Sequence, residues 1–246
     1  MTEQPRRSTL LALRRWANQL GLRSHKVFAV GFNKTGTSSL HALFQSLGLP
    51  SYHGVDWRAC DDPGLLRKYD CFSDGIPRDL AKLDRMFPGA KFILQVRELD
   101  AWVHSRLAHI AQAKARNVHE PDPGWDTTEH SITGWIERRN THHMLVLSHF
   151  AQRPNDLLVV NFIRDPAAAT KICRFIGFSG EHRKPEKNVH VQGTYPFRHV
   201  DMLARCLARL GVPDDERSND ILCPSLLGEE MRLRFPADTR MLEREP

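Results

Sequence analysis

The stretch VFAVGFNKTGTSSL, residues 27–40, decides the fold. It opens with a short apolar run that ends at Gly31, which is typical of a buried strand. A polar turn bounded by Gly31 and Gly36 follows, and residues 38–47 then carry apolar side chains at the helical spacings of three and four. Backbone N–H groups converge where a tight glycine turn meets a helix N-terminus, and the helix dipole favours negative charge there. This stretch therefore predicts a phosphate-binding loop between a strand and a helix.

The loop differs from the one that binds nucleoside triphosphates. In that pattern, G-x-x-x-x-G-K-[ST], a lysine follows the second glycine directly. Here Gly31 and Gly36 keep the spacing, but Thr37 occupies the lysine position and the lysine is Lys34, between the glycines. A lysine at this position can reach the bridging oxygen of a nucleotide's 5′-phosphate, but it is poorly placed to clamp a γ-phosphate. The loop therefore favours transfer of a group that is carried on a 5′-phosphate.

Composition and charge narrow the class of protein. The chain of 246 residues is long enough for one domain or at most two, and its 41% hydrophobic and 26% charged residues are ordinary for a globular protein. The net charge of +6 suits an anionic ligand or surface. The arginines are scattered and no basic run is interleaved with aromatic residues, so we expect no nucleic-acid partner.

The five cysteines are odd in number and lack C-x-x-C spacing. We therefore expect no disulfide framework and a reducing, cytoplasmic compartment. No apolar run approaches the length of a transmembrane helix, and the run at 10–13 is too short for the core of a signal peptide. Clustered Cys/His spacings and an H-E-x-x-H pattern are also missing, so we expect no metal.

Strand and helix patterns alternate along the chain. Strands are predicted at 26–31, 51–53, 71–73, 91–96 and 157–161, and helices at 37–48, 78–86, 99–116, 131–152, 166–176 and 199–210. Loops are predicted at 61–64, 117–130 and 179–198. This alternation predicts an α/β protein with a parallel sheet flanked by helices on both faces. Ligands bind such sheets at the carboxyl ends of the strands, which places the 31–39 loop, Asp74, Arg97 and Asn161 on one edge.

Three segments are expected in the chain: an N-terminal arm or helix (1–25), the α/β domain (26–211) and a C-terminal accessory segment (212–246). The basic amphipathic stretch Leu10–Leu20 favours a helix packed on the domain. The alternative is a helix that lies on an anionic membrane surface, which would make the protein membrane-associated through peripheral contact.

Residues 34–40, KTGTSSL, resemble the phosphosulfate-binding loop of sulfotransferases that use 3′-phosphoadenosine-5′-phosphosulfate (PAPS). A second match follows the predicted strand at 91–96, where Arg97 is followed eight residues later by Ser105. This is similar to the family's 3′-phosphate signature, and an arginine fork with a hydroxyl suits a phosphate. The alternative for the pair is a surface ion pair and a solvated helix residue.

A third likeness lies in the loop after residue 179. Gln192, Gly193, Thr194 and Tyr195, followed by a proline, are similar to the K-G-R-x-Y-P stretch that closes over the adenosine in carbohydrate sulfotransferases. The lysine is replaced by Gln192 and one residue is missing before Tyr195. Lys184, Lys187 or Arg198 could supply the lost charge. The alternative is a solvated charged loop.

The resemblance implies a P-loop-like sulfotransferase architecture and transfer of the sulfuryl group from PAPS to a hydroxyl of a carbohydrate, a glycolipid or a small natural product. The product would be 3′,5′-adenosine bisphosphate (PAP). Lys34 would act on the bridging oxygen, and Arg97 with Ser105 would hold the 3′-phosphate. The 5′-phosphate would be held by the loop residues Asn33, Lys34, Thr35, Gly36, Thr37, Ser38 and Ser39.

The acceptor hydroxyl needs a general base, which is a histidine or a carboxylate in this family. Asp74 is the first candidate, His53 the second and Asp56 the third, whereas His41 is expected to face solvent. Two other functions compete with sulfotransfer. A magnesium-dependent kinase or NTPase is disfavoured by Thr37 and by Arg97, which stands where such enzymes place a strand-end aspartate. A non-catalytic nucleotide-binding module is the other alternative.

Overall fold

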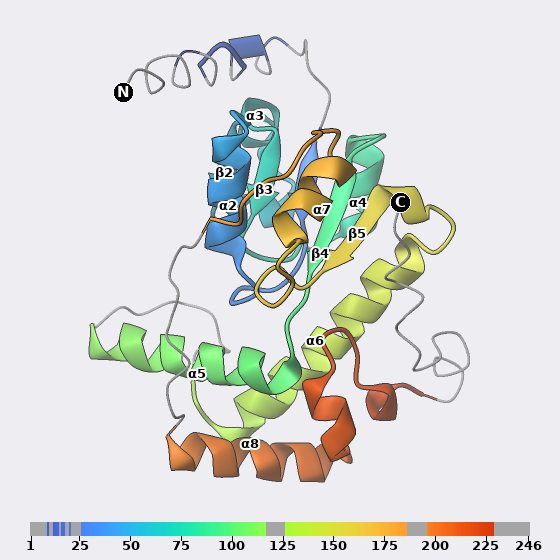
Figure 1. The fold of residues 1–246 in the computed structure, drawn as a ribbon. Coiled ribbons are helices and arrows are strands. Elements are labelled where there is room, and N and C mark those ends of the chain that lie inside the picture. Colours follow the sequence, from blue (N-terminus) through green and yellow to red (C-terminus); the bar gives the residue numbers. More distant parts are fainter. Residues whose placement is uncertain are drawn as a thin grey trace. The chain divides into compact units, whose positions relative to one another are not determined.

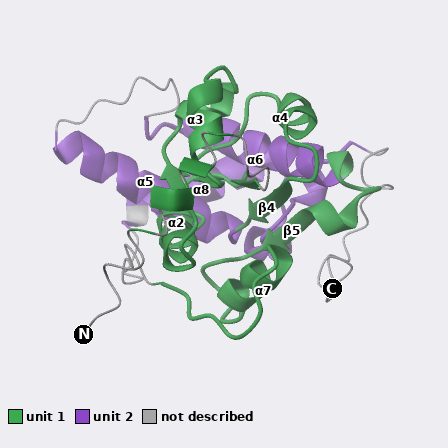
Figure 2. Cartoon of the chain, turned by 90° about the horizontal axis from the view of Figure 1, so that it is seen from above, with its two compact units in different colours: residues 1–96, 148–189 green, residues 97–147, 190–246 purple. Residues whose placement is uncertain are grey.

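The computed structural model describes residues 9, 12–14, 16, 17, 20, 26–116, 126–185 and 196–228. The chain forms two compact units (Figure 2). Unit 1 comprises residues 1–96 and 148–189, and unit 2 comprises residues 97–147 and 190–246. The division at residues 25 and 211 that the sequence suggests stays a prediction.

Unit 1 is built on a five-stranded, all-parallel sheet with the strand order β2-β3-β1-β4-β5 (Figure 1). The central strand β1 is in register with both neighbours, since Phe28 pairs with Phe72 on one side and with Phe92 on the other. The strands are β1 Val27–Ala29, β2 Ser51–His53, β3 Cys71–Ser73, β4 Lys91–Gln95 and β5 Leu157–Val160. This arrangement confirms the predicted α/β class, and each predicted strand is present.

Helices cover both faces of this sheet. Side chains alternate along β1, so that Val27 and Ala29 join an apolar cluster with α2 and α7, whereas Phe28 points to the opposite face. There Phe28 stacks on Phe72 at 5.1 Å between ring centroids and lies 5.9 Å from the ring of Trp57. The helical segments of unit 1 are α2 Thr37–Ser46, η1 Asp56–Ala59, α3 Pro63–Lys68, α4 Leu80–Met86, η2 Pro154–Asp156 and α7 Ala168–Phe175.

Helix α3 corrects the predicted loop at 61–64. Asp62 caps the helix, because its Oδ1 accepts the backbone N–H of Leu65 at 2.9 Å. Pro63 occupies the first helical position, where its missing N–H costs nothing, and Leu66 is buried beneath the helix. The D-D-P-G sequence was thus a helix start and not a turn.

Unit 2 consists of helices and short 3₁₀ segments. They are α5 Leu99–Ala115, α6 Glu129–His149, α8 Phe197–Leu210, η3 Asp214–Ser218 and η4 Pro224–Leu226, and the last two residues of α6 belong to unit 1. Trp102 and Trp135 are buried here, which makes them core residues. Asp100 of α5 is paired with Arg217 of η3 at 2.7 Å. The first part of the C-terminal segment therefore packs within this unit.

The described residues show no helix that combines the length and the apolar character needed to cross a bilayer. All five cysteines fall within the described ranges, and each is buried and unbridged. This agrees with the expected absence of a disulfide framework.

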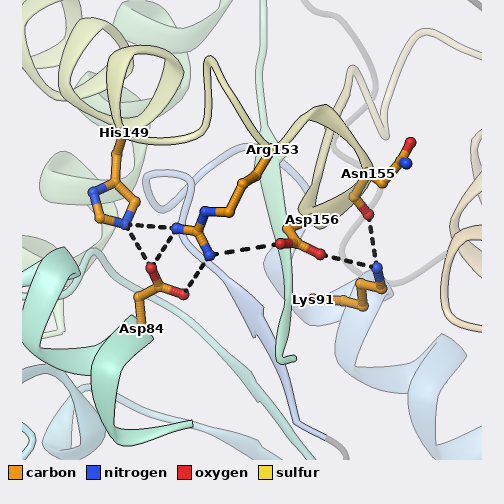
Figure 3. Close-up of polar contacts among 6 residues, drawn as sticks. All are labelled: Asp84, Lys91, His149, Arg153, Asn155 and Asp156. Atoms are coloured by element: carbon orange, nitrogen blue, oxygen red, sulfur yellow. Dashed lines mark hydrogen bonds and ion pairs between the residues drawn. The ribbon is translucent and has the colours of Figure 1, made fainter. Parts of the chain in front are cut away.

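A charged network within unit 1 connects α4 to the last residue of α6 and to the chain that follows it (Figure 3). Asp84 accepts hydrogen bonds from Arg153, and its Oδ2 lies 2.8 Å from His149 Nε2. Arg153 also lies 3.5 Å from Asp156, which binds Lys91 of β4 at 3.1 Å. Burial acts to raise the pKa of the Asp84 carboxyl, but the hydrogen bonds from Arg153 and His149 outweigh it and hold that pKa below its usual value.

We expect Asp84→Asn to lower the free energy of unfolding at pH 7 by about 1 kcal/mol, since Arg153 is partly exposed and solvent screens the pair. For a chain of this size the melting temperature would fall by about 2–4 °C. Because the folded-state pKa of Asp84 is lowered, its contribution is present above about pH 4 and is lost as the pH falls through the folded pKa. Thermal melts from pH 7 to pH 3 should therefore show wild type and variant converging in acid.

Asp201→Asn is the matched control, because it removes an exposed carboxylate from an i,i+4 pair with Arg205. That variant should melt within about 1 °C of wild type. An Asp84→Asn variant with an unchanged melting temperature at pH 7 would contradict the stabilising role of the network.

Candidate active site

The loop after β1 is held in shape by its own hydrogen bonds and by β4. Gly31 donates its N–H to Gln95 Oε1 at 2.7 Å, and Thr35 Oγ1 donates to the carbonyl of Phe32 at 2.6 Å. Lys34 has a φ of 67° and Gly36 a φ of 93°, so the backbone takes the left-handed conformation twice within three residues. This is the tight turn that the glycine spacing predicts, and it ends at the first residue of α2.

Two glycines are required by close contacts. A Cβ on Gly31 would lie 2.3 Å from the carbonyl oxygen of Gln95, a distance that no side chain could tolerate. A Cβ on Gly36 would lie 3.1 Å from the ring of Phe162, at a φ that L-residues rarely adopt. Gly36 is the N-cap of α2 and offers it no side-chain cap, and the first turn of the helix has no acidic residue. The N-terminus of α2 is therefore suited to an anion.

His53, at the end of β2, lies between this loop and Asp74. Its Nε2 is 3.4 Å from both Thr37 Oγ1 and Ser38 Oγ, and its Nδ1 is 3.9 Å from Asp74 Oδ2. Both side chains are about one quarter exposed. The two leading candidates for the general base are thus neighbours, and the imidazole ring presents one nitrogen to the helix start and the other to the carboxylate.

Asp74 sits in a strained turn at the end of β3. Its φ is 79°, and the φ of the next residue, Gly75, is 119°. A Cβ on Gly75 would lie 2.6 Å from Arg58 Cδ. Arg58 also donates its Nε–H to the carbonyl of Ile76 at 3.2 Å, so that its side chain braces the turn. A left-handed aspartate costs conformational energy, and such outliers cluster at functional sites.

The other base candidate, Asp56, is engaged elsewhere. It is exposed and accepts a hydrogen bond from the hydroxyl of Tyr52. That bond is the main cause that raises the pKa of Tyr52 to about 12. His41 was wrongly expected to face solvent: it is half-buried, with Nδ1 2.8 Å from Ser51 Oγ and its ring 5.4 Å from that of His53. Burial of the imidazole is the main cause that lowers the pKa of His41, and the charge of the nearby His53 ring lowers that pKa further.

Two polar residues near the β5 end have structural contacts. Asn161 Oδ1 accepts the backbone N–H groups of Ile163 and Arg164, which shapes the turn after β5. Lys184 donates to the carbonyl of Ile163 at 2.7 Å. Since a Cβ on Gly36 would also contact Ile163, this amine binds a segment that borders the loop.

Arg97 and Ser105 belong to unit 2. Arg97 lies just before α5 and Ser105 lies within that helix, and both side chains are half-buried. The backbone carbonyl of Arg97 accepts a hydrogen bond from Arg139 of α6 at 3.1 Å. The eight-residue spacing therefore places the serine two turns into a helix whose start is tied to α6.

Some predicted positions fall outside the described residues. Gln192, Gly193, Thr194 and Tyr195 are among them, as are Lys187 and most of the N-terminal segment. Of that segment, the described side chains of Leu13, Trp16 and Leu20 are exposed, and Arg14 donates to the carbonyl of Gly48 at 2.6 Å.

The sequence reasoning missed three polar residues that shape these segments: Gln95, Arg58 and Arg139. Two of them leave a signal in the sequence. Gln95 is the polar member of an otherwise apolar strand end, and Arg139 interrupts the apolar stripe of a long helix. Arg58 leaves no such signal, because the turn-like composition of its stretch gives no indication that its side chain lies next to Gly75.

Comparison with known families gives one finding. Residues 58–155 match the family model described as "Sulfotransferase domain". The matched residues include Asp74, Arg97 and Ser105, whereas the 31–39 loop and His53 precede them. No curated protein matches the chain. The match confirms the resemblance to sulfotransferases and supports sulfotransfer as the class of reaction.

Proposed function

We propose that this chain, which carries a sulfotransferase domain match over residues 58–155, transfers the sulfuryl group of PAPS to a hydroxyl and releases PAP. The observation that carries the proposal is the position of His53 between the Lys34–Ser39 loop and Asp74. The loop offers a lysine and a helix N-terminus to a sulfated 5′-phosphate, and the imidazole offers a base next to it.

In the proposed reaction, the acceptor oxygen forms a bond to sulfur while the bond between sulfur and the bridging oxygen breaks. The transition state of such transfers is loose, and negative charge grows on the leaving oxygen. Lys34 stabilises that charge, and the backbone and hydroxyl groups from Asn33 to Ser39 hold the 5′-phosphate. The electron pair of the broken bond stays with PAP, whose 5′-phosphate is the leaving group.

The proton of the acceptor hydroxyl is assigned to His53. Its Nε2 faces the hydroxyl groups of Thr37 and Ser38, and its Nδ1 faces Asp74. A carboxylate on the Nδ1 side favours the tautomer that leaves Nε2 free to accept a proton, and it stabilises the imidazolium that forms. Asp74 is thus assigned to orienting the base.

Arg97 and Ser105 are assigned to the 3′-phosphate of the donor. A guanidinium and a hydroxyl are the donors that a phosphate monoester recruits, and the arginine supplies charge-assisted bonds. This assignment would make the 3′-phosphate the feature that separates PAPS from other adenine nucleotides. For the acceptor we propose a hydroxyl of a carbohydrate, a glycolipid or a small natural product. Contact of residues 1–25 with a membrane surface stays a prediction.

Binding of PAP, AMP and ATP with magnesium, measured by isothermal titration calorimetry, tests the proposal. We expect PAP to bind at least about tenfold more tightly than AMP, because a charge-assisted hydrogen bond contributes about 1.5–3 kcal/mol. Equal affinities for PAP and AMP would overturn the donor assignment. Tighter binding of ATP with magnesium than of PAP would instead favour a kinase or NTPase.

A transfer assay with ³⁵S-labelled PAPS and a panel of sugars, glycolipids and phenols tests the second half of the proposal. Label transferred to an acceptor by wild type, but not by Lys34→Ala, is the expected result. If PAP binds tightly but no acceptor in the panel is labelled, a non-catalytic nucleotide-binding module becomes the better reading.

A further inference from the structure

The apolar stripe of α6 is interrupted by three polar side chains. The stripe follows helical spacing through Ile132, Trp135, Ile136, Met144 and Leu147, all of them buried. Arg139, Asn140 and His143 lie on the same stripe, and each is at most 3% exposed. Burial of a guanidinium and two polar groups is costly unless they are hydrogen-bonded. Their partners therefore show what these residues do.

All three side chains bind backbone of unit 2. Arg139 Nη2 lies within hydrogen-bond distance of the carbonyl oxygens of Arg97 (3.1 Å), Asn219 (2.9 Å) and Asp220 (2.6 Å). Asn140 accepts the backbone N–H of residue 223 at 2.7 Å, and His143 Nδ1 lies 2.6 Å from the carbonyl of residue 221. The helix thus binds four of the five backbone positions from 219 to 223 in the C-terminal segment, and of the three side chains Arg139 also binds Arg97.

A second tie connects the same segment to α5. Arg217 of η3 forms a two-pronged ion pair with Asp100, in which Nη2 lies 2.7 Å and Nε 3.1 Å from Oδ2. Asp100 is in the first turn of α5, three residues after Arg97. The start of α5 is therefore held at the Arg97 carbonyl by Arg139 and at the Asp100 carboxylate by Arg217.

We infer that Arg139 is a positioning residue for the 3′-phosphate of the donor, which it serves by holding the backbone of Arg97 against residues 219 and 220. The inference rests on the proposed function, in which Arg97 binds that phosphate. A bidentate arginine contact is sensitive to small displacements of the side chain. Fixing the carbonyl of Arg97 limits the positions from which its guanidinium can reach the ligand. The three carbonyl contacts of Arg139 converge on Nη2 at the end of its side chain, a position beyond the reach of the shorter lysine side chain.

The readout that tests this role is the ratio of the dissociation constants for AMP and PAP, because it isolates the contribution of the 3′-phosphate. Arg139→Lys keeps the charge but shortens the side chain and so weakens the hydrogen bond to the carbonyl of Arg97. We expect this variant to lower the ratio about tenfold. Asn140→Ala is the matched control, since it releases the same C-terminal segment without a contact to Arg97. It should lower the melting temperature and leave the ratio within about twofold of wild type.

Arg97→Ala separates failure of the inference from failure of the proposed function. If Arg97→Ala leaves the ratio at the wild-type value, the assignment of the 3′-phosphate is wrong and the inference is overturned with it. If Arg97→Ala abolishes the preference for PAP but Arg139→Lys keeps it, only the inference is overturned. A melting temperature lowered equally by Arg139→Lys and Asn140→Ala, with both ratios unchanged, would likewise show that Arg139 is merely structural.

A double variant completes the test. In the Arg97→Ala background, Arg139→Lys should not change the ratio further, because its effect passes through Arg97. If Arg139→Lys does not fold, Arg139→Met is measured in its place, since it fills the buried volume without a charge. A wild-type ratio in that variant would overturn the inference in the same way.

Discussion

Replacing Lys34 with alanine is expected to lower kcat for sulfuryl transfer by about 10²–10³-fold, while PAP binds within about tenfold of wild type. The loss of one preorganised donor to a developing anion costs about this much in other enzymes. Lys34 is assigned to the bridging oxygen, whose charge grows only as the bond to sulfur breaks. Removing it should therefore raise the energy of the transition state much more than that of the bound donor.

The left-handed backbone conformation of Lys34 means that the experiment needs a control for changes in the shape of the loop. The lysine's φ of 67° is unfavourable for most residues, so a variant could fail because the loop has changed shape. Asparagine tolerates this conformation better than other non-glycine residues, so Lys34→Asn removes the amine with the least disturbance. Lys171→Ala removes an exposed amine that pairs with Asp165 and should keep kcat within about threefold.

The outcome is decided by single-turnover rates with labelled PAPS, together with PAP titrations of each variant. Lys34→Ala and Lys34→Asn should lose the same large factor in rate. A Lys34→Asn enzyme that transfers sulfuryl groups at more than about one tenth of the wild-type rate would rule out the leaving-oxygen assignment.

Replacing His53 with alanine is expected to lower kcat by about 10²–10⁴-fold, the range that general-base catalysis usually contributes. The imidazole is the group that lies 3.4 Å from the hydroxyls at the start of α2, with Asp74 on its far side. Asp74→Asn should have a smaller effect, about tenfold, since the base would remain and lose only its orienting carboxylate. Donor affinity should change little in both variants.

Asp56→Asn is the matched control for this pair. Asp56 was also a candidate base, but it is exposed and bound to Tyr52, so its loss should leave kcat within about twofold. If Asp74→Asn removes activity and His53→Ala does not, the two roles are exchanged and Asp74 is the base. If both variants keep kcat within about threefold of wild type, neither residue takes the proton.

Most of the sheet could be predicted from the sequence because its strands are short and bounded by turn residues, and because β1, β4 and β5 are largely apolar. The strands at 51–53 and 71–73 were predicted at their observed bounds. Helix α3 was missed for a physical reason: D-D-P-G is turn chemistry by composition, and only the bond from Leu65 N–H to Asp62 shows it to be a helix cap. Local composition cannot separate these cases, because caps and turns use the same residues.

The residues of the candidate site could be predicted better than the residues that hold them in position, such as Gln95 and Arg139. The loop could be recognised because its conformation requires a positive φ at residue 36, and the glycine at that position is visible in the sequence. The pairing of His53 with Asp74 needed the order of the strands, since only the adjacency of β2 and β3 makes them neighbours. The contacts of Arg139 join residues up to 81 positions apart, and no local pattern specifies such a partner.

The strand order of unit 1 has a consequence for how such an enzyme could change its acceptor. Strand β1 lies at the centre of the sheet, with β3 and then β2 on one side and β4 and then β5 on the other. His53 is the last residue of β2 and Asp74 directly follows β3, whereas Gln95, which anchors the loop after β1, is the last residue of β4. Under the proposed function, insertions after β2 or β3 would therefore change the acceptor specificity, while the loop after β1 that binds the donor would keep its structure.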